Sequence, residues 1–84
     1  MALLETLAES LAEQAMALSK RTDDPTVIEK VSKTLGDSSQ TLQEAFLTVV
    51  RIRTAAERGQ ATIDALVGGE EVDILDHPSL RDDH

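Results

Sequence analysis

Small and apolar residues recur at alternating intervals of three and four through the middle of the chain. This spacing is typical of the a and d positions of helices that pack side by side in bundles and coiled coils. Because exposing such a row to water is unfavourable, the sequence predicts helices that associate through it. We call this row the seam; it consists of Ile28, Val31, Leu35, Ser38, Leu42, Ala45, Val49, Ile52, Ala56, Gly59, Ile63 and Leu66.

The amino-acid composition supports an all-α fold. Among the 84 residues there are one aromatic residue, four glycines, two prolines and no cysteine. β-Sheet domains normally rely on aromatic and β-branched strands separated by frequent turns, whereas Ala, Leu, Glu and Gln favour helices. We therefore predict an all-α protein that associates into a helical bundle. Its unit is either an antiparallel helical hairpin with a long second helix or a three-helix bundle.

A polar turn separates two expected helices, over about residues 2–21 and 26–67. Asp24 is a good N-cap and Pro25 a good first helical residue. A connection this short favours antiparallel neighbours. On the first helix, leucines form one stripe that alanines widen, and this stripe is expected to face the second helix. Its members are Leu4, Leu7, Ala8, Leu11, Ala12, Ala15 and Leu18.

The segment around Gly36 leaves the number of helices open. The four residues that begin with Gly36 commonly end one helix and start another, and the residues after them have the capping-box spacing. The seam nevertheless keeps its phase across Gly36, and packing can override a propensity cost of about 2–3 kcal/mol. We therefore favour one continuous helix over residues 26–67, with a break at residues 36–40 as the alternative.

The end of the chain differs from the helical domain predicted for residues 1–67. Gly68-Gly69 indicates a helix stop, and residues 70–84 contain six acidic residues and one arginine. We expect residues 68–84 to form an acidic, flexible tail. Its apolar residues either dock into a partner groove as a short motif or belong to a tail that only solubilises the protein. The possible motif consists of Val72, Ile74, Leu75 and Leu80.

A chain of this length builds a marginal core unless disulfides, a metal or oligomerisation support it. The absence of cysteine excludes disulfides, and both histidines lie in the last eight residues. A continuous second helix would also outgrow the first and leave residues 45–67 uncovered. We therefore predict a homo-oligomer, most simply a two-fold dimer. Its expected interface is formed by Phe46, Leu47, Val49, Val50, Ile52, Ala56, Gly59, Ile63 and Leu66.

Charge limits the classes of partner. The formal net charge is −8, and residues 70–84 contribute −5 of it. Nonspecific nucleic-acid binding and docking on anionic lipid both need clustered cations, so neither direct nucleic-acid binding nor membrane association is expected. The lack of a long apolar span and of a signal peptide indicates a cytoplasmic protein. Arg51, Arg53 and Arg58 keep open the interpretation of a subunit in a phage-type packaging or scaffold ring.

No residue pattern points to catalysis. The serines have no histidine at helical spacing, there is no Gly-rich phosphate loop, and no cofactor or metal site is expected. The stripe of Glu5, Glu9 and Glu13 is expected to be a solvated helix face. The sequence therefore predicts a non-enzymatic module for self-assembly or protein interaction. The alternative is an adaptor, regulator or chaperone-like protein whose apolar face binds a helix of another protein.

Overall fold

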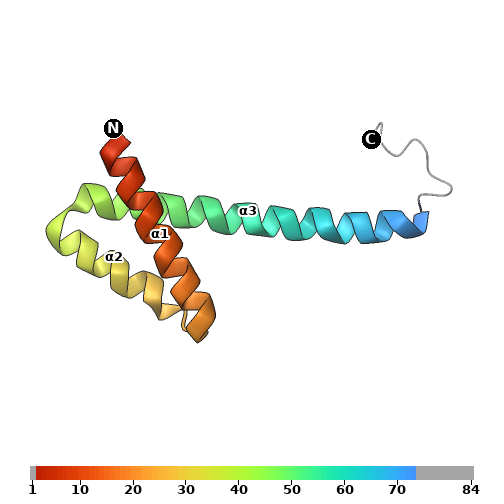
Figure 1. Cartoon of the computed structure of the whole chain (residues 1–84), viewed down its shortest axis with the longest axis horizontal. Helices are drawn as coiled ribbons and strands as arrows, with labels where there is room; N and C mark the ends of the chain where they lie inside the picture. Colours follow the sequence, from red (N-terminus) through yellow and green to blue (C-terminus); the bar gives the residue numbers. More distant parts are fainter. Residues whose placement is uncertain (1, 74–84) are drawn as a thin grey trace. The chain divides into compact units, whose positions relative to one another are not determined.

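The computed structural model describes the backbone of residues 2–73 and the side chains of residues 2–69. This part of the chain forms three helices, α1 (Ala2–Thr22), α2 (Thr26–Ser38) and α3 (Gln40–Asp73), and it contains no strand (Figure 1). The all-α prediction is therefore confirmed. The chain divides into two compact units, Met1–Thr54 and Ala55–His84. The first unit holds α1, α2 and the first part of α3, and the second holds the remaining part of α3.

The continuous second helix that we favoured from the seam is wrong, and the alternative break within residues 36–40 is confirmed. Ser39 has an extended backbone (φ −157°, ψ 105°) and separates α2 from α3, which meet at this bend in Figure 1. Its hydroxyl accepts a hydrogen bond from the Leu42 N–H at 3.1 Å, as an N-cap does. The seam keeps its phase because each helix needs its own apolar face, and this does not require the two helices to be continuous.

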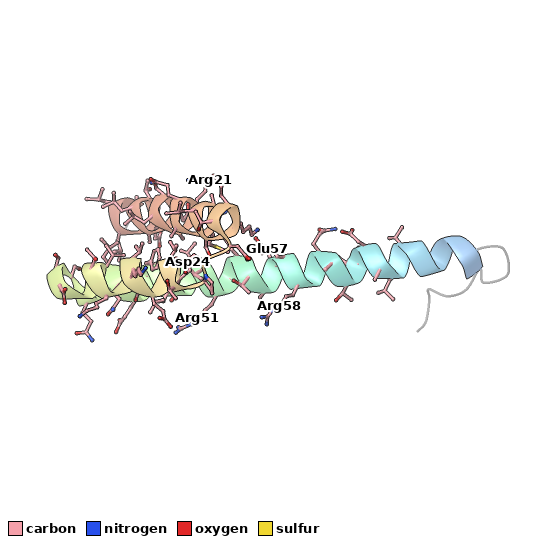
Figure 2. All side chains as sticks on the ribbon, turned by 90° about the horizontal axis from the view of Figure 1, so that it is seen from below. Arg21, Asp24, Arg51, Glu57 and Arg58 are labelled. Atoms are coloured by element: carbon pink, nitrogen blue, oxygen red, sulfur yellow. The ribbon has the colours of Figure 1, made fainter. Side chains whose placement is uncertain are left out.

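The turn between α1 and α2 is held by Asp24 (Figure 2). Its Oδ1 accepts hydrogen bonds from the Thr26 hydroxyl at 2.6 Å and from the Thr26 N–H at 2.9 Å. Pro25 already has helical dihedral angles (φ −70°, ψ −13°), so Asp24 serves as the N-cap expected from the sequence. These two bonds, the hydroxyl first, lower the pKa of Asp24 below its ordinary value of 3.8. The ionised Asp24 carboxylate therefore stabilises the folded state at pH values above 3.8. This contribution is lost as the pH falls through the lowered pKa of the folded state.

The core of the first unit is small and lies where its three helices meet. It consists of Ala12 and Ala15 from α1, Val27 from α2 and Phe46 from α3. Figure 2 shows α1 lying on one side of α2 and the first part of α3. Partly buried residues surround this cluster: Leu11, Ile28, Val31, Leu35, Leu47, Val49 and Val50.

Helix α1 packs through its alanines rather than through its leucines. Ala8, Ala12 and Ala15 are buried, whereas Leu4 and Leu11 are half-buried and Leu7 and Leu18 are exposed. The predicted stripe is therefore correct as a face, but its centre lies on the small residues. Alanine allows the helix backbones to approach more closely than leucine would, so the centre of the contact has little room for a larger side chain.

Gly36 is a helical residue of α2 that lets a side chain of α3 cross it. Gln43 Nε2 donates to the Ser32 carbonyl oxygen at 2.9 Å and lies 3.2 Å from the Ser32 hydroxyl oxygen. A Cβ at position 36 would come within 2.5 Å of that same Nε2. Gly36, which the sequence marked as part of a possible helix break, thus leaves room for a hydrogen bond between the two helices.

We expect Gly36→Ala and Gln43→Ala to be strongly coupled. In the Gln43→Ala background, Gly36→Ala should raise the free energy of unfolding by about 1 kcal/mol, because alanine is the better helix former. In the wild-type background this gain should disappear, because the methyl group displaces the amide and breaks hydrogen bonds worth about 0.5–1.5 kcal/mol each. Urea unfolding of the four chains measures the coupling. Effects that add within about 0.5 kcal/mol would contradict the role of Gly36.

The helix stop expected at Gly68-Gly69 is also wrong. Helix α3 continues through both glycines to Asp73, beyond the predicted end at residue 67. Each glycine costs a helix about 1 kcal/mol relative to alanine, but neither forbids it. Residues 74–84 of the predicted tail lie outside the part of the chain that the structure describes.

Candidate functional site

The structure divides the predicted interface into a buried group and an exposed group. Phe46 is 0% exposed and is the largest fully buried side chain among the described residues. Leu47, Val49 and Val50 are half-buried and pack against the core that contains Phe46. The prediction of Phe46 as an interface residue is therefore corrected, because its side chain is covered by the chain's own helices.

The sequence correctly indicated that the residues around Phe46 would be buried. Residues 45–50 are apolar around most of the helix, and such a helix is usually buried on more than one side. Phe46 packs against residues of α1 and α2 of the same chain. The sequence had instead led us to expect that a second copy of the chain would cover it. The break at Ser39 explains the difference, because it makes α2 a separate helix that packs with α1 and the first part of α3 in one core.

The exposed group begins near the end of the first unit. Ile52, in that unit, is 62% exposed. In the second unit, every residue from 55 to 69 is exposed. Here the seam continues with four residues, which we call the C-terminal seam: Ala56, Gly59, Ile63 and Leu66.

Two large apolar side chains dominate the C-terminal seam. Ile63 is 53% and Leu66 is 66% exposed. Val67, which the sequence analysis did not include, is also an exposed large hydrophobic residue. Monomeric proteins expose single apolar side chains routinely, but a row of them at helical spacing is typical of an interaction surface.

The other two residues of the C-terminal seam have small side chains or none. Ala56 and Gly59 precede the two large residues, and a Cβ built at Gly59 meets nothing within 4 Å. No atom of the described chain therefore requires a glycine at this position. A small residue on an exposed helix face allows another backbone to approach closely.

Polar residues flank the C-terminal seam without forming a catalytic arrangement. Gln60 Nε2 donates to Asp64 Oδ1 at 2.9 Å along the helix. Arg51, Arg53 and Arg58 are exposed, and Figure 2 shows the Arg58 side chain extending away from the ribbon. These arginines lie on α3, the helix that carries the C-terminal seam.

The remaining predicted site residues are placed as follows. Glu5, Glu9 and Glu13 are exposed on α1, as expected of a solvated face. Val72 belongs to α3, but its side chain lies outside the described part, and so do all the other members of the possible tail motif: Ile74, Leu75 and Leu80. Among the described residues, no group of three or more acidic or histidine side chains gathers to hold a metal ion.

Sequence reasoning missed one exposed apolar feature on α1. Leu3 and Leu7, one turn apart, are both exposed large hydrophobic residues. The spacing of the leucines was visible in the sequence, but periodicity alone did not show that the alanines would occupy the core face. In the described chain, no helix has an apolar stretch long enough to cross a membrane.

No protein-family model, curated protein or solved structure matches this chain. The exposed C-terminal seam is therefore the feature from which a function can be argued.

Proposed function

We propose that the chain is a non-enzymatic helical module that assembles with copies of itself through the C-terminal seam. The observation that supports this proposal is the exposure of Ile63 and Leu66 at a and d spacing on α3. In the second unit every described side chain is exposed. A second helix packed against the C-terminal seam would therefore bury its apolar side chains. The first unit, in contrast, already covers its own largest side chain.

The free energy available from this burial sets the expected strength of association. Burying a whole Ile or Leu side chain contributes about 1.5–3 kcal/mol, and roughly half of each is exposed here. Four such side chains in a two-fold dimer therefore contribute on the order of 3–6 kcal/mol. This is comparable to the lower range of the entropic cost of association. We expect reversible, concentration-dependent assembly.

Ile63→Asp should abolish the assembly. An aspartate in the seam would have to lose its hydration in the contact, a cost of several kcal/mol. Ala61→Asp is the matched control, because residue 61 lies about 200° around the helix from residue 63 and is also exposed. Light scattering after size exclusion, over about a hundredfold range of concentration, measures the mass of each protein.

The expected outcome separates the two charge variants. The wild-type chain and Ala61→Asp should gain mass and melt at higher temperature as the concentration rises. Ile63→Asp should remain monomeric with an unchanged far-UV circular dichroism spectrum at low concentration, because residue 63 is outside the buried core. A wild-type chain that stays monomeric across the range would overturn the proposal.

A second candidate function is the binding of a helix from another protein, as an adaptor or regulator does. The observation that favours it is the exposed pair Leu3 and Leu7, which lie one turn apart on α1. An exposed apolar pair at helical spacing fits the apolar face of an amphipathic helix. A monomeric wild-type chain would direct the search to this surface. The packaging or scaffold ring stays a prediction, because it rests on exposed arginines alone.

A further inference from the structure

We infer that two copies of α3 pair in antiparallel orientation along the C-terminal seam, with the two-fold axis at residue 61. This inference rests on the proposed self-assembly and specifies its partner, orientation and register. In a two-fold interface, residue i faces residue j and residue j faces residue i. With the axis at residue 61, facing residues lie at equal distances on either side of it.

The sizes of the seam residues are complementary in this register. Gly59 and Ile63 lie two residues on either side of position 61, and Ala56 and Leu66 lie five residues on either side. Each small residue of one copy therefore faces a large residue of the other: Gly59 faces Ile63 and Ala56 faces Leu66. Facing positions that alternate large and small side chains interdigitate and fill the space between helices.

Parallel pairing in register would lose this complementarity. Gly59 would face Gly59 of the second copy, and Ile63 would face Ile63. The end of the contact at Gly59 would then contain a void, and the end at Ile63 would be overpacked. Voids and overpacking both reduce stability by amounts comparable to the burial energy of a single side chain.

The distribution of charge along α3 agrees with this axis. Arg51, Arg53 and Arg58, together with Glu57, give residues 51–58 a formal charge of +2. The segment 64–71 contains Asp64, Glu70 and Glu71 and no basic residue, so its formal charge is −3. Reflection about residue 61 places residues 51–58 of one copy beside residues 64–71 of the other.

Parallel pairing would instead align like charges. Individual exposed ion pairs contribute little to affinity, but the overall charge pattern discriminates between orientations because like charges side by side are unfavourable. A helix whose seam is complementary in side-chain size, and whose two ends are complementary in charge, fits a second copy of itself. The complementarity of side-chain size and of charge therefore favours a second copy of the chain as the partner of the C-terminal seam.

Spin-label distances test the orientation directly. The chain has no cysteine, so Ala61→Cys and Gly68→Cys each introduce a single labelling site. Both positions are exposed, and a side chain at position 68 meets nothing within 4 Å. The two positions are seven residues apart, which is about two helical turns, so their labels share one side of α3.

The antiparallel register predicts unequal distances. The two labels at position 61 lie at the same height along the dimer, whereas the two labels at position 68 are offset by about 21 Å along its axis. The distance measured between labels at position 68 should therefore exceed that between labels at position 61. Dilution with unlabelled chain should remove both signals, and light scattering of each labelled variant establishes that it still assembles.

The other outcomes separate this inference from the proposed function. Equal distances at the two positions indicate either parallel pairing or an antiparallel axis midway between them; both overturn the inference, while self-assembly stands. A longer distance at position 61 than at position 68 indicates an antiparallel register with another axis and overturns it as well. If the unlabelled wild-type chain is monomeric at the concentration used, both the inference and the proposed function fail.

Discussion

Phe46→Ala is expected to unfold the first unit of the chain. Phe46 has no exposed surface and is the largest member of a core whose other members are alanines and one valine. Removing a buried phenylalanine ring typically costs about 3–5 kcal/mol. A single small domain has only a few kcal/mol of net stability, so the variant should lose most of its helix content at room temperature.

Circular dichroism at low protein concentration measures this effect, with urea titration of the wild-type chain as reference. Thr48→Ala is the matched control, because it truncates an exposed residue of the same helix and should change stability by less than about 0.5 kcal/mol. A Phe46→Ala chain that keeps its helix content and urea midpoint, but loses the ability to assemble, would place Phe46 at an interface between copies.

Ala12→Leu should have the second-largest effect. Ala12 is fully buried where α1 meets the other helices of its unit, and extra methylene groups forced into a packed contact typically cost about 1–3 kcal/mol. Ala17→Leu is the same change at an exposed position of the same helix. Because leucine and alanine have similar helix propensities, this control should be nearly neutral.

The urea midpoints of the Ala12→Leu and Ala17→Leu chains decide how α1 packs. A lower midpoint for Ala12→Leu alone supports close packing through the alanines. A higher midpoint for Ala12→Leu would mean that the helices have room for leucine at this contact, as a leucine-centred stripe would imply. The experiment thus distinguishes the observed core face from the one that hydrophobic periodicity suggests.

Much of the fold is predictable from local sequence signals. The polar turn with Asp24 and Pro25 sets the start of α2, and the observed hydrogen bonds of Asp24 are those of an N-cap. Such signals are readable because capping involves residues adjacent in sequence. The role of Gly36 was not predictable for the opposite reason: its need for a small residue comes from Gln43, a side chain of the next helix.

The candidate surface was predicted in part. The a and d spacing correctly marked Ile63 and Leu66 as apolar positions of α3, and both are exposed. The same spacing assigned Phe46 and its neighbours to that surface, although α1 and α2 cover them. Periodicity identifies a face that avoids water, but it does not identify the neighbour that removes it from water.

Local sequence signals were sufficient to predict the all-α class, the approximate limits of α1 and the apolar face of each helix, because helix propensity, capping and periodicity act over a few residues. The bend at Ser39, the alanines on the core face of α1, and the burial of Phe46 with the exposure of Ile63 became clear from the packed helices alone. These outcomes depend on close packing between helices distant in sequence, where side-chain volume and the hydrogen bond from Gln43 to Ser32 decide the fit.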